Sequence, residues 1–294
     1  MIIVRFRGGL GNQMFQYALY RKMQLLGNTV CADLSLYENK RAAPFVLTDA
    51  FPNASRYFKI GLKAEDWYNN LPSRSLFSRV LAVVFPEKSK YVFEREDSKY
   101  APFILRCKDC VLDGYWQTEK YWKDIKDIIR AELSFHKEDS DDLNDIEAMI
   151  QQNVSVCVHV RRGDYLLPQN QLLFSNICTK EYYRKAQEVI CHSVSNAKFF
   201  FFSDDIEWVK ENLQCRDAVF VQDYIGTRYP DWYEMYLMSI CKHNIIANST
   251  FSWWGAYLND YDNKIVVAPA NWINNKKTPD ILPESWIKID GRSK

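Results

Sequence analysis

Residues 154–165 read Val-Ser-Val-Cys-Val-His-Val-Arg-Arg-Gly-Asp-Tyr, a run of alternating valines that ends abruptly in charge. The alternation predicts a strand, and the residues after it lie where an open α/β sheet presents ligands, at the carboxyl ends of its strands. Two adjacent guanidinium groups at such an edge favour a phosphate-bearing ligand. A salt-bridged strand end is the competing interpretation of Arg161, Arg162 and Asp164.

The alternation also predicts which side chains of this stretch act together. Odd positions of a strand share one face, so His159 and Arg161 should point together while Arg162 points away. We therefore expect Arg161 to grip a diphosphate, Arg162 and Asp164 to form a supporting pair, and Gly163 to permit the bend. His159 on its own would more often be a packed histidine than a ligand.

Outward from this strand, apolar runs alternate with amphipathic segments. Strands are expected at 197–202, 219–221, 244–247 and 264–268 with helices between them, which predicts a parallel, doubly wound sheet. The beginning of the chain reads as strand 2–6, helix 12–26 and strand 29–33, followed by short helices and loops over 37–105, a strand at 111–116 and a helix at 119–133. The acidic stretch 134–153 marks a boundary, so we expect α/β domains at 1–150 and 151–294.

Three further motifs fall where strands end. Gly8-Gly9-Leu10-Gly11-Asn12-Gln13 is a glycine-rich strand-to-helix turn that could admit an anion or a sugar, or be a tight turn capped by Asn12. Asp204 and Asp205 could accept hydrogen bonds from guanine or ribose, or cap the next helix. Ser249, Thr250 and Phe251 could offer hydroxyl and amide groups to a phosphate, or simply cap.

Composition excludes several other classes of protein. A formal net charge of +1 over 294 residues gives no general attraction to nucleic acid. The eight cysteines include one close pair, Cys107 and Cys110, without the partners of a zinc site, and they suit a reducing cytosol. No signal peptide is expected from residues 1–7, and the apolar run 80–85 is too short to span a bilayer, although it could touch one.

No cluster of metal ligands is apparent apart from Asp204-Asp205 and Asp260-x-Asp262. We therefore expect no cofactor and no metal, with arginine stabilising a departing diphosphate instead.

Taken together and in order, these motifs resemble the bacterial α-1,2-fucosyltransferases of glycosyltransferase family 11. The resemblance spans roughly residues 1–255. It is carried by the glycine turn with its continuation to Ala18, and by the segments 114–121, 159–165, 202–205 and 248–254.

The resemblance implies a GT-B fold, with an acceptor-side N-terminal domain, a C-terminal GDP-sugar domain and a cleft between them. It implies metal-independent, inverting transfer of L-fucose from GDP-L-fucose to the 2-hydroxyl of a terminal sugar, usually β-galactose. By position, Arg161 would hold the β-phosphate, His159 and Asp204 or Asp205 would approach guanine and ribose, and Ser249, Thr250 and Phe251 would line the phosphates. Asn12 would sit at the cleft.

Several alternatives stay open. The general base could be Asp164, Glu119 or Asp223, or the departing diphosphate itself could take the proton; Asp164 is favoured as a residue that orients an arginine. The protein could use another donor or linkage, or be an inactive glycan-binding relative. The acceptor is an oligosaccharide or a lipid-linked glycan, and the expected location is the cytoplasm, at the inner face of the membrane if the acceptor is lipid-linked.

Overall fold

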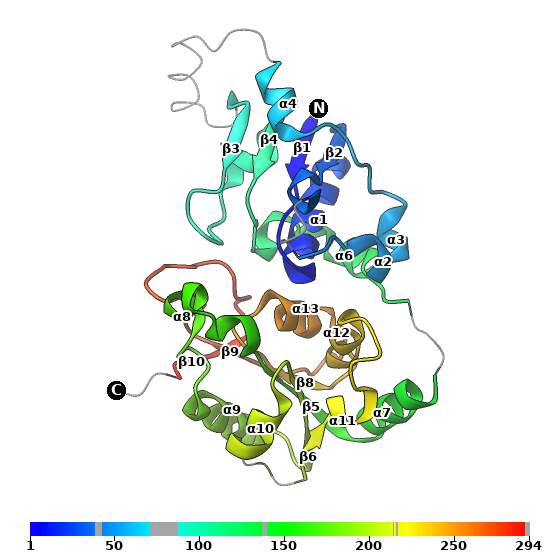
Figure 1. Ribbon diagram of the computed structural model, residues 1–294, viewed down its shortest axis with the longest axis vertical. Coiled ribbons are helices and arrows are strands. Elements are labelled where there is room, and N and C mark those ends of the chain that lie inside the picture. Colours follow the sequence, from blue (N-terminus) through cyan, green and yellow to red (C-terminus); the bar gives the residue numbers. More distant parts are fainter. Residues whose placement is uncertain (39–42, 71–87, 137–139, 214, 216, 292–294) are drawn as a thin grey trace. The chain divides into compact units, whose positions relative to one another are not determined.

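The computed structural model describes residues 1–38, 43–70, 88–136, 140–213, 215 and 217–291, and it divides into two compact units (Figure 1). The first unit comprises residues 1–136 and 278–281, and the second comprises residues 137–277 and 282–294. Each unit contains a parallel β-sheet with helices, so the α/β class is confirmed, with the two Rossmann-like units that a GT-B fold requires. The apolar run 80–85 lies outside the described residues.

The sheet of the first unit has the order β2-β1-β4-β3, and its registered pairs are parallel. Its strands are β1 (Ile2–Arg5), β2 (Val30–Asp33), β3 (Tyr91–Phe93) and β4 (Cys110–Asp113). The predicted β-α-β opening is confirmed, but helix α1 (Leu10–Leu25) begins two residues earlier than expected, so Asn12 lies in its first turn and Gly9 is the N-cap. Strand β3 was not predicted within 37–105.

Short helices make up much of the rest of the first unit. They are η1 (Ser35–Glu38), α2 (Leu47–Ala50), α3 (Pro52–Ser55), α4 (Ala64–Asn69), η3 (Pro102–Arg106), η4 (Glu119–Tyr121), η5 (Lys123–Ile125) and α6 (Lys126–Glu132). The single helix predicted over 119–133 is therefore wrong. It breaks at the buried Trp122, whose φ of −141° and ψ of 14° are not helical.

The sheet of the second unit has the order β10-β9-β8-β5-β6-β7, and every registered pair is parallel. Its strands are β5 (Val154–Val160), β6 (Ala197–Ser203), β7 (Val219–Phe220), β8 (His243–Ile245), β9 (Val266–Pro269) and β10 (Ile287–Ile289). This is the strand order of a doubly wound nucleotide-binding domain, as predicted, although β10 was not anticipated. The strand order reverses between β5 and β8, where such folds bind ligands.

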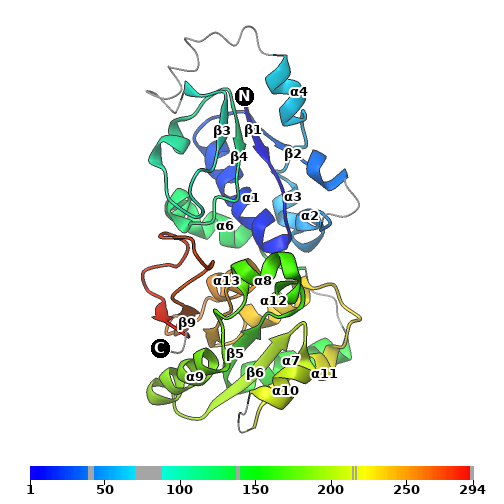
Figure 2. The same ribbon diagram turned by 60° about the vertical axis from the view of Figure 1, so that its left-hand side comes forward.

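Helices cover both faces of this sheet (Figure 2). The helices described in this unit are α7 (Asp141–Gln152), η6 (Gly163–Leu166), α8 (Pro168–Phe174), α9 (Lys180–Ser193), α10 (Ile206–Asn212), α11 (Gln222–Ile225), α12 (Trp232–Ser239) and α13 (Thr250–Leu258). Valines 156, 158 and 160 pack against α9 and α10, whereas Cys157 packs toward α7 and α12. His159 and Arg161 continue the Cys157 side of the strand.

The boundary between the units differs from the expected one. Helix α7 contains the acidic stretch that was expected to separate the domains, but it belongs to the second unit. Its buried face, made by Leu143, Ile146 and Ile150, packs into the same core as Cys157 and Phe200. The division therefore falls between residues 136 and 137 rather than at 150, because an amphipathic helix stays with the sheet that buries its apolar side.

Within the part of the chain that the structure describes, no helix combines the length and apolarity needed to cross a bilayer.

Candidate functional site

The predicted motifs of the second unit meet at one edge of its sheet. Arg161 and Arg162 follow β5, Asp204 and Asp205 follow β6, and Asn248 lies between β8 and α13. Because β5, β6 and β8 are neighbouring parallel strands, their carboxyl ends lie side by side. The motifs surround the topological switch point, which is the place between β5 and β8 where the strand order reverses.

Arg161 is held at this edge by two carboxylates. Its Nη2 and Nε lie 2.7 and 2.9 Å from Asp164 Oδ1, and its Nη1 lies 3.1 Å from Asp204 Oδ2. The side chain still keeps 35% of its surface exposed. The guanidinium group is thus fixed in orientation while part of it stays open to a ligand, as bidentate phosphate recognition requires.

Arg162 makes a separate pair and turns the other way. Its Nε lies 2.9 Å from Asp205 Oδ2, and its guanidinium stacks 3.8 Å from the ring centre of Trp208. Asp205 also caps α10 by accepting a hydrogen bond from the backbone N–H of Trp208. The expected pairing of Arg162 with Asp164 is therefore wrong: the Asp164 carboxylate contacts Arg161 instead. Arg162 and Asp205 support the loop.

Gly163 allows this arrangement because Asp204 approaches it closely. A Cβ at position 163 would lie 2.6 Å from Asp204 Oδ2, the oxygen that contacts Arg161. The other oxygen of Asp204 accepts the backbone N–H of Arg162 at 2.8 Å. Asp204 therefore connects the loop after β5 to the end of β6, and a side chain at residue 163 would displace it.

His159 is buried beside Arg161, and its ring lies 6.1 Å from that of Phe251. Burial, together with the positive charge of Arg161, lowers the pKa of His159 to about 3. The imidazole is therefore neutral at physiological pH. Its Nδ1 is a buried polar atom that finds no hydrogen-bond partner in the described part of the chain.

The segment after β8 is fixed by Asn248. Its side chain donates to the carbonyls of Phe174 and Trp272, and its own carbonyl accepts the hydroxyl of Tyr165. Ser249 then caps α13, with its hydroxyl accepting the backbone N–H of Phe251. Ser249, Thr250 and Phe251 are therefore placed at a helix N-terminus on the same edge as Arg161, although the Ser249 hydroxyl is already used as a cap.

Glu234 is a residue of this region that the sequence analysis did not select. Burial raises the pKa of Glu234 to about 7; Asp231 and Asp204 add to the shift, while Gln222 and Arg161 oppose it. Asp231, the residue before α12, has helical backbone angles, and its side chain makes no capping bond. The signal available in the sequence was a lone carboxylate within the apolar run of α12.

The glycine turn lies at the carboxyl end of β1 in the first unit. Gly8 has a φ of +80°, and a Cβ there would lie 2.5 Å from the Asn12 side chain. Asn12 Oδ1 accepts a hydrogen bond of 2.8 Å from Gln117 Nε2. Gln13 ties the turn to the segment before α2 by bonding the carbonyls of Gly8 and Pro44. Asn12 thus joins two loops of this unit, and its expected place at a cleft stays a prediction.

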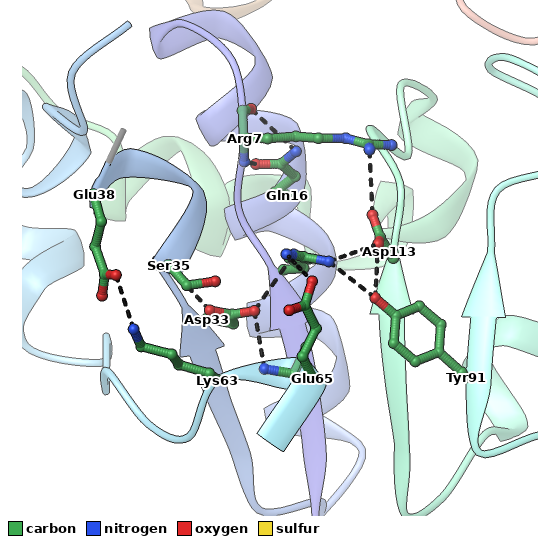
Figure 3. Close-up of polar contacts among 11 residues, drawn as sticks. Arg7, Gln16, Asp33, Ser35, Glu38, Lys63, Glu65, Tyr91 and Asp113 are labelled. Atoms are coloured by element: carbon green, nitrogen blue, oxygen red, sulfur yellow. Dashed lines mark hydrogen bonds and ion pairs between the residues drawn. The ribbon is translucent and has the colours of Figure 1, made fainter. Parts of the chain in front are cut away.

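A second arginine–carboxylate cluster occupies this edge of the first unit. Figure 3 shows Asp33, Glu65, Tyr91 and Asp113 converging on one point, where Arg5 contacts all four. Arg7 also reaches Asp113, at 3.3 Å. The Arg5 side chain is only 11% exposed and surrounded by carboxylates, so this cluster ties the ends of β1, β2 and β4 together and leaves Arg5 unable to bind phosphate.

Each predicted candidate for a general base is paired with a cation. Asp164 holds Arg161, Asp223 lies 2.8 Å from Lys210, and Glu119 lies 3.8 Å from Lys123. Among the described residues, no group of three or more His, Cys, Asp or Glu side chains is arranged to hold a metal ion.

Comparison with known proteins agrees with this arrangement of motifs. The model of glycosyl transferase family 11 matches residues 88–290, more than half of the chain. This chain belongs to glycosyltransferase family 11. It is thus a glycosyltransferase, as the motifs predicted.

Relatives cover nearly the whole chain. An α-1,2-colitosyltransferase of Escherichia coli is 32% identical over 99% of both chains, and the O-antigen biosynthesis glycosyltransferase WbnK of the same species is 30% identical over 96% of this chain and 98% of its own. A galactoside 2-α-L-fucosyltransferase of Caenorhabditis elegans is 26% identical over 98% of this chain and 79% of its own. Among solved structures, the fucosyltransferase NodZ from Bradyrhizobium aligns with a TM-score of 0.45 and 17% identity, covering 86% of this chain and 91% of its own.

Proposed function

We propose that this glycosyltransferase moves L-fucose from GDP-β-L-fucose to the 2-hydroxyl of a terminal β-galactosyl sugar, forming an α-1,2 linkage. The observation that carries the proposal is the Arg161 guanidinium group, oriented by two carboxylates and still partly open at the switch point of a doubly wound parallel sheet. The names of the relatives, which include α-1,2-colitosyl and galactoside 2-α-L-fucosyl transferases, support the linkage and the donor class.

In the proposed reaction, the acceptor 2-oxygen attacks C1 of fucose on the face opposite the nucleotide. The C1–oxygen bond to the diphosphate breaks, and its electron pair passes to the β-phosphate oxygen. Arg161 stabilises the negative charge that develops there, which is the kind of interaction that lowers a transition-state barrier. The acceptor proton passes to a carboxylate or to the departing diphosphate, with Asp164 acting by orienting Arg161.

The remaining residues of the edge are proposed to hold the nucleotide. Backbone amides at the start of α13 would face the phosphates. His159 is neutral, and its Nδ1 has no hydrogen-bond partner among the described residues, so we propose that the ring approaches guanine or ribose. Asp204 and Asp205 already bind the two arginines, so Glu234 is a further carboxylate able to accept N–H groups of guanine when ionised.

The test is an assay of GDP release by purified protein given GDP-fucose and lactose, with and without EDTA. We expect release that EDTA does not reduce, because Arg161 supplies the positive charge that a metal supplies in other transferases. Loss of activity with EDTA and recovery with a divalent cation would contradict the metal-independent mechanism. Absence of GDP release across a panel of galactosides would contradict the proposed donor.

Arg161→Ala should lower kcat by roughly 10²–10³-fold, the effect of removing one donor to a developing oxyanion. Arg161→Lys should recover only part of the rate, because an ammonium group lacks the planar fork. Arg184→Ala is the matched control, since Arg184 is an exposed arginine of the same unit that pairs with Glu181 and Glu188 on α9. Near-normal turnover by Arg161→Ala would remove Arg161 from the mechanism.

A second donor has specific support, because the relative that is 32% identical over the full chain is named a colitosyltransferase. Assaying GDP-colitose beside GDP-fucose with the same acceptors decides between the two sugars. A higher kcat/KM with GDP-colitose would assign colitosyl transfer, and linkage analysis of the product would identify the bond in either case.

The acceptor is proposed to be an oligosaccharide or a lipid-linked glycan used in the cytoplasm, in line with the relative named for O-antigen biosynthesis. All eight cysteines are free thiols, which suits a reducing compartment. Sedimentation of the protein with vesicles that carry a lipid-linked galactoside, compared with bare vesicles, tests whether the acceptor draws the enzyme to a membrane.

A further inference from the structure

Tyr165 follows Asp164 in the short turn η6 and connects two loops of the second unit. Consecutive residues of a 3₁₀ turn project about 120° apart, because the turn has three residues per revolution. Asp164 contacts Arg161, on the loop after β5, whereas the Tyr165 hydroxyl donates a hydrogen bond of 2.8 Å to the backbone carbonyl of Asn248, after β8. One turn of the chain therefore holds both sides of the switch point.

The hydroxyl contact is part of a closed set of three residues. The Tyr165 ring stacks on that of Phe174, with ring centres 4.8 Å apart and an interplanar angle of 21°. The carbonyl of Phe174 accepts a hydrogen bond of 3.2 Å from Asn248 Nδ2. Each of the three residues contacts the other two, so any shift of Asn248 relative to η6 would break at least one contact.

Asn248 transmits this constraint to α13. The residue is 3% exposed, and its Nδ2 also donates to the carbonyl of Trp272 at 3.1 Å. Ser249, which follows directly, is the N-cap of α13, so the position of Asn248 decides where the helix begins. Burial raises the pKa of Tyr165, so its hydroxyl stays protonated and remains a donor at physiological pH.

The same turn fixes Arg161. Asp164 Oδ1 lies 2.7 and 2.9 Å from two nitrogens of the guanidinium group. The Tyr165 ring borders that group, with its centre 5.9 Å from Arg161 Cζ, close to the outer limit of a cation–π contact. Because Asp164 and Tyr165 are adjacent in the backbone, a displacement of Tyr165 would also move the carboxylate that orients the arginine.

We propose that Tyr165 is a positioning residue, whose hydroxyl sets the spacing between Arg161 and the first residues of α13 so that one diphosphate can bind both. The inference rests on the proposed function and adds a residue that aligns its nucleotide site. Spacing matters there because a displacement of about 1 Å can lower a rate roughly a hundredfold.

Tyr165→Phe tests the hydroxyl, because it keeps the ring and its stacking on Phe174. Calorimetric titration with GDP and with GMP gives the readout, since only GDP has the β-phosphate assigned to Arg161. The Kd for GDP should rise roughly five- to tenfold, the effect of one hydrogen bond, while the Kd for GMP changes less than about twofold. An equal rise for both nucleotides, as a general loosening of the fold would give, or no rise for either, would overturn the proposal.

Tyr182→Phe is the matched control. Tyr182 is a fully buried tyrosine of the same unit, and its hydroxyl donates to the backbone carbonyls of Ile246 and Val267. It should lower stability in urea while leaving both Kd values unchanged. Phe174→Leu is a second variant, to be used as well if Tyr165→Phe does not fold, because it weakens the same set of contacts and should raise the Kd for GDP in the same selective way.

A double-mutant cycle with Arg161→Ala shows whether Tyr165 acts through the guanidinium group. In the Arg161→Ala background, Tyr165→Phe should change the Kd for GDP by less than about twofold, because the group that it positions is gone. Additive effects of the two substitutions would make Tyr165 independent of Arg161 and contradict the positioning role.

Nucleotide binding also separates this inference from the proposed function, because it needs neither an acceptor nor a choice between donor sugars. Binding of GDP that depends on Arg161 but not on Tyr165 would remove the positioning role alone. Failure of the wild type to bind GDP would overturn the proposed function and the positioning role together. In the transfer assay, Tyr165→Phe should lower kcat roughly tenfold and leave the KM for the acceptor unchanged.

Discussion

At the scale of single residues, Arg5 at the end of β1 and Arg161 just after β5 have opposite roles. Arg5 contacts three carboxylates and a tyrosine hydroxyl, and its side chain is 11% exposed. Its positive charge is therefore neutralised by groups within the protein. Arg161 contacts two carboxylates and is 35% exposed. The number of partners and the remaining exposure, rather than the residue type, separate a structural arginine from one that can receive a phosphate.

Glu234→Gln should change how stability depends on pH. Burial raises the pKa of Glu234 from 4.5 to about 7, so the folded protein holds this proton more tightly than the unfolded chain. The stabilisation is complete below pH 4.5 and is lost as the pH rises through about 7. Because glutamine cannot ionise, the variant should match the wild type near pH 4 and exceed its free energy of unfolding by about 1–3 kcal/mol near pH 8.

Urea unfolding at both pH values measures this difference. Glu211→Gln is the control, since Glu211 is an exposed carboxylate at the end of α10 in the same unit and should give no such divergence. Parallel pH profiles of the wild type and Glu234→Gln would show that Glu234 titrates normally.

At the scale of elements, α7 shows how a helix is assigned to a unit. Its outer face carries the acidic residues that marked a linker in the sequence. Its inner face contributes Leu143, Ile146 and Ile150 to the core that also holds Cys157 and Phe200 of β5 and β6. The strand bearing the site is therefore supported from behind by this helix.

Ile146→Ala should destabilise the second unit by about 2–5 kcal/mol, because the side chain is fully buried and its loss leaves a cavity against β5. Thermal or urea unfolding followed by tryptophan fluorescence measures the effect. Gln152→Ala, at an exposed position of the same helix, should change stability by less than about 0.5 kcal/mol. An equal effect of the two substitutions would show that α7 does not pack as described.

At the scale of the whole molecule, each unit carries a parallel sheet whose order reverses beside its first strand. In the second unit the reversal lies between β5 and β8, and the candidate nucleotide residues gather there. In the first unit it lies between β1 and β4, where the Arg5 cluster fills the sheet edge. The same position in the sheet thus holds a candidate binding site in one unit and a structural ion-pair cluster in the other.

Hydrogen exchange should locate GDP on the second unit. Saturating GDP in metal-free buffer should slow exchange in the loops at 161–166, 204–206 and 248–251, which follow β5, β6 and β8. The peptide containing β10, away from that edge in sheet order, serves as the internal control. No protection of these three loops, or protection that persists in Arg161→Ala, would contradict the proposed nucleotide site.

Sequence patterns predicted most of the second unit because the alternation or apolar character of a long strand can be recognised from neighbouring residues alone. Strands β5 and β6 are seven residues long, with strong alternation or continuous apolar character, and they appear where expected. Strands β3 and β10 have three residues each, too few for a period to show, and they form because a neighbouring strand offers backbone partners. The break at Trp122 was missed for the same reason: burial of the indole, not local preference, sets its backbone.

The sequence by itself therefore determined the α/β class, the family and the positions of Arg161, the Asp204–Asp205 pair and Ser249, because hydrophobic periodicity and turn chemistry act over a few residues. Only the tertiary structure decided that Asp164 pairs with Arg161, that the pKa of Glu234 is raised by burial, and that Asp204 fixes the same guanidinium group as Asp164. Asp164 is close to Arg161 in sequence, but Asp204, which fixes the same guanidinium group, follows another strand, and the pKa of Glu234 depends on burial among several elements; folding alone brings such groups together.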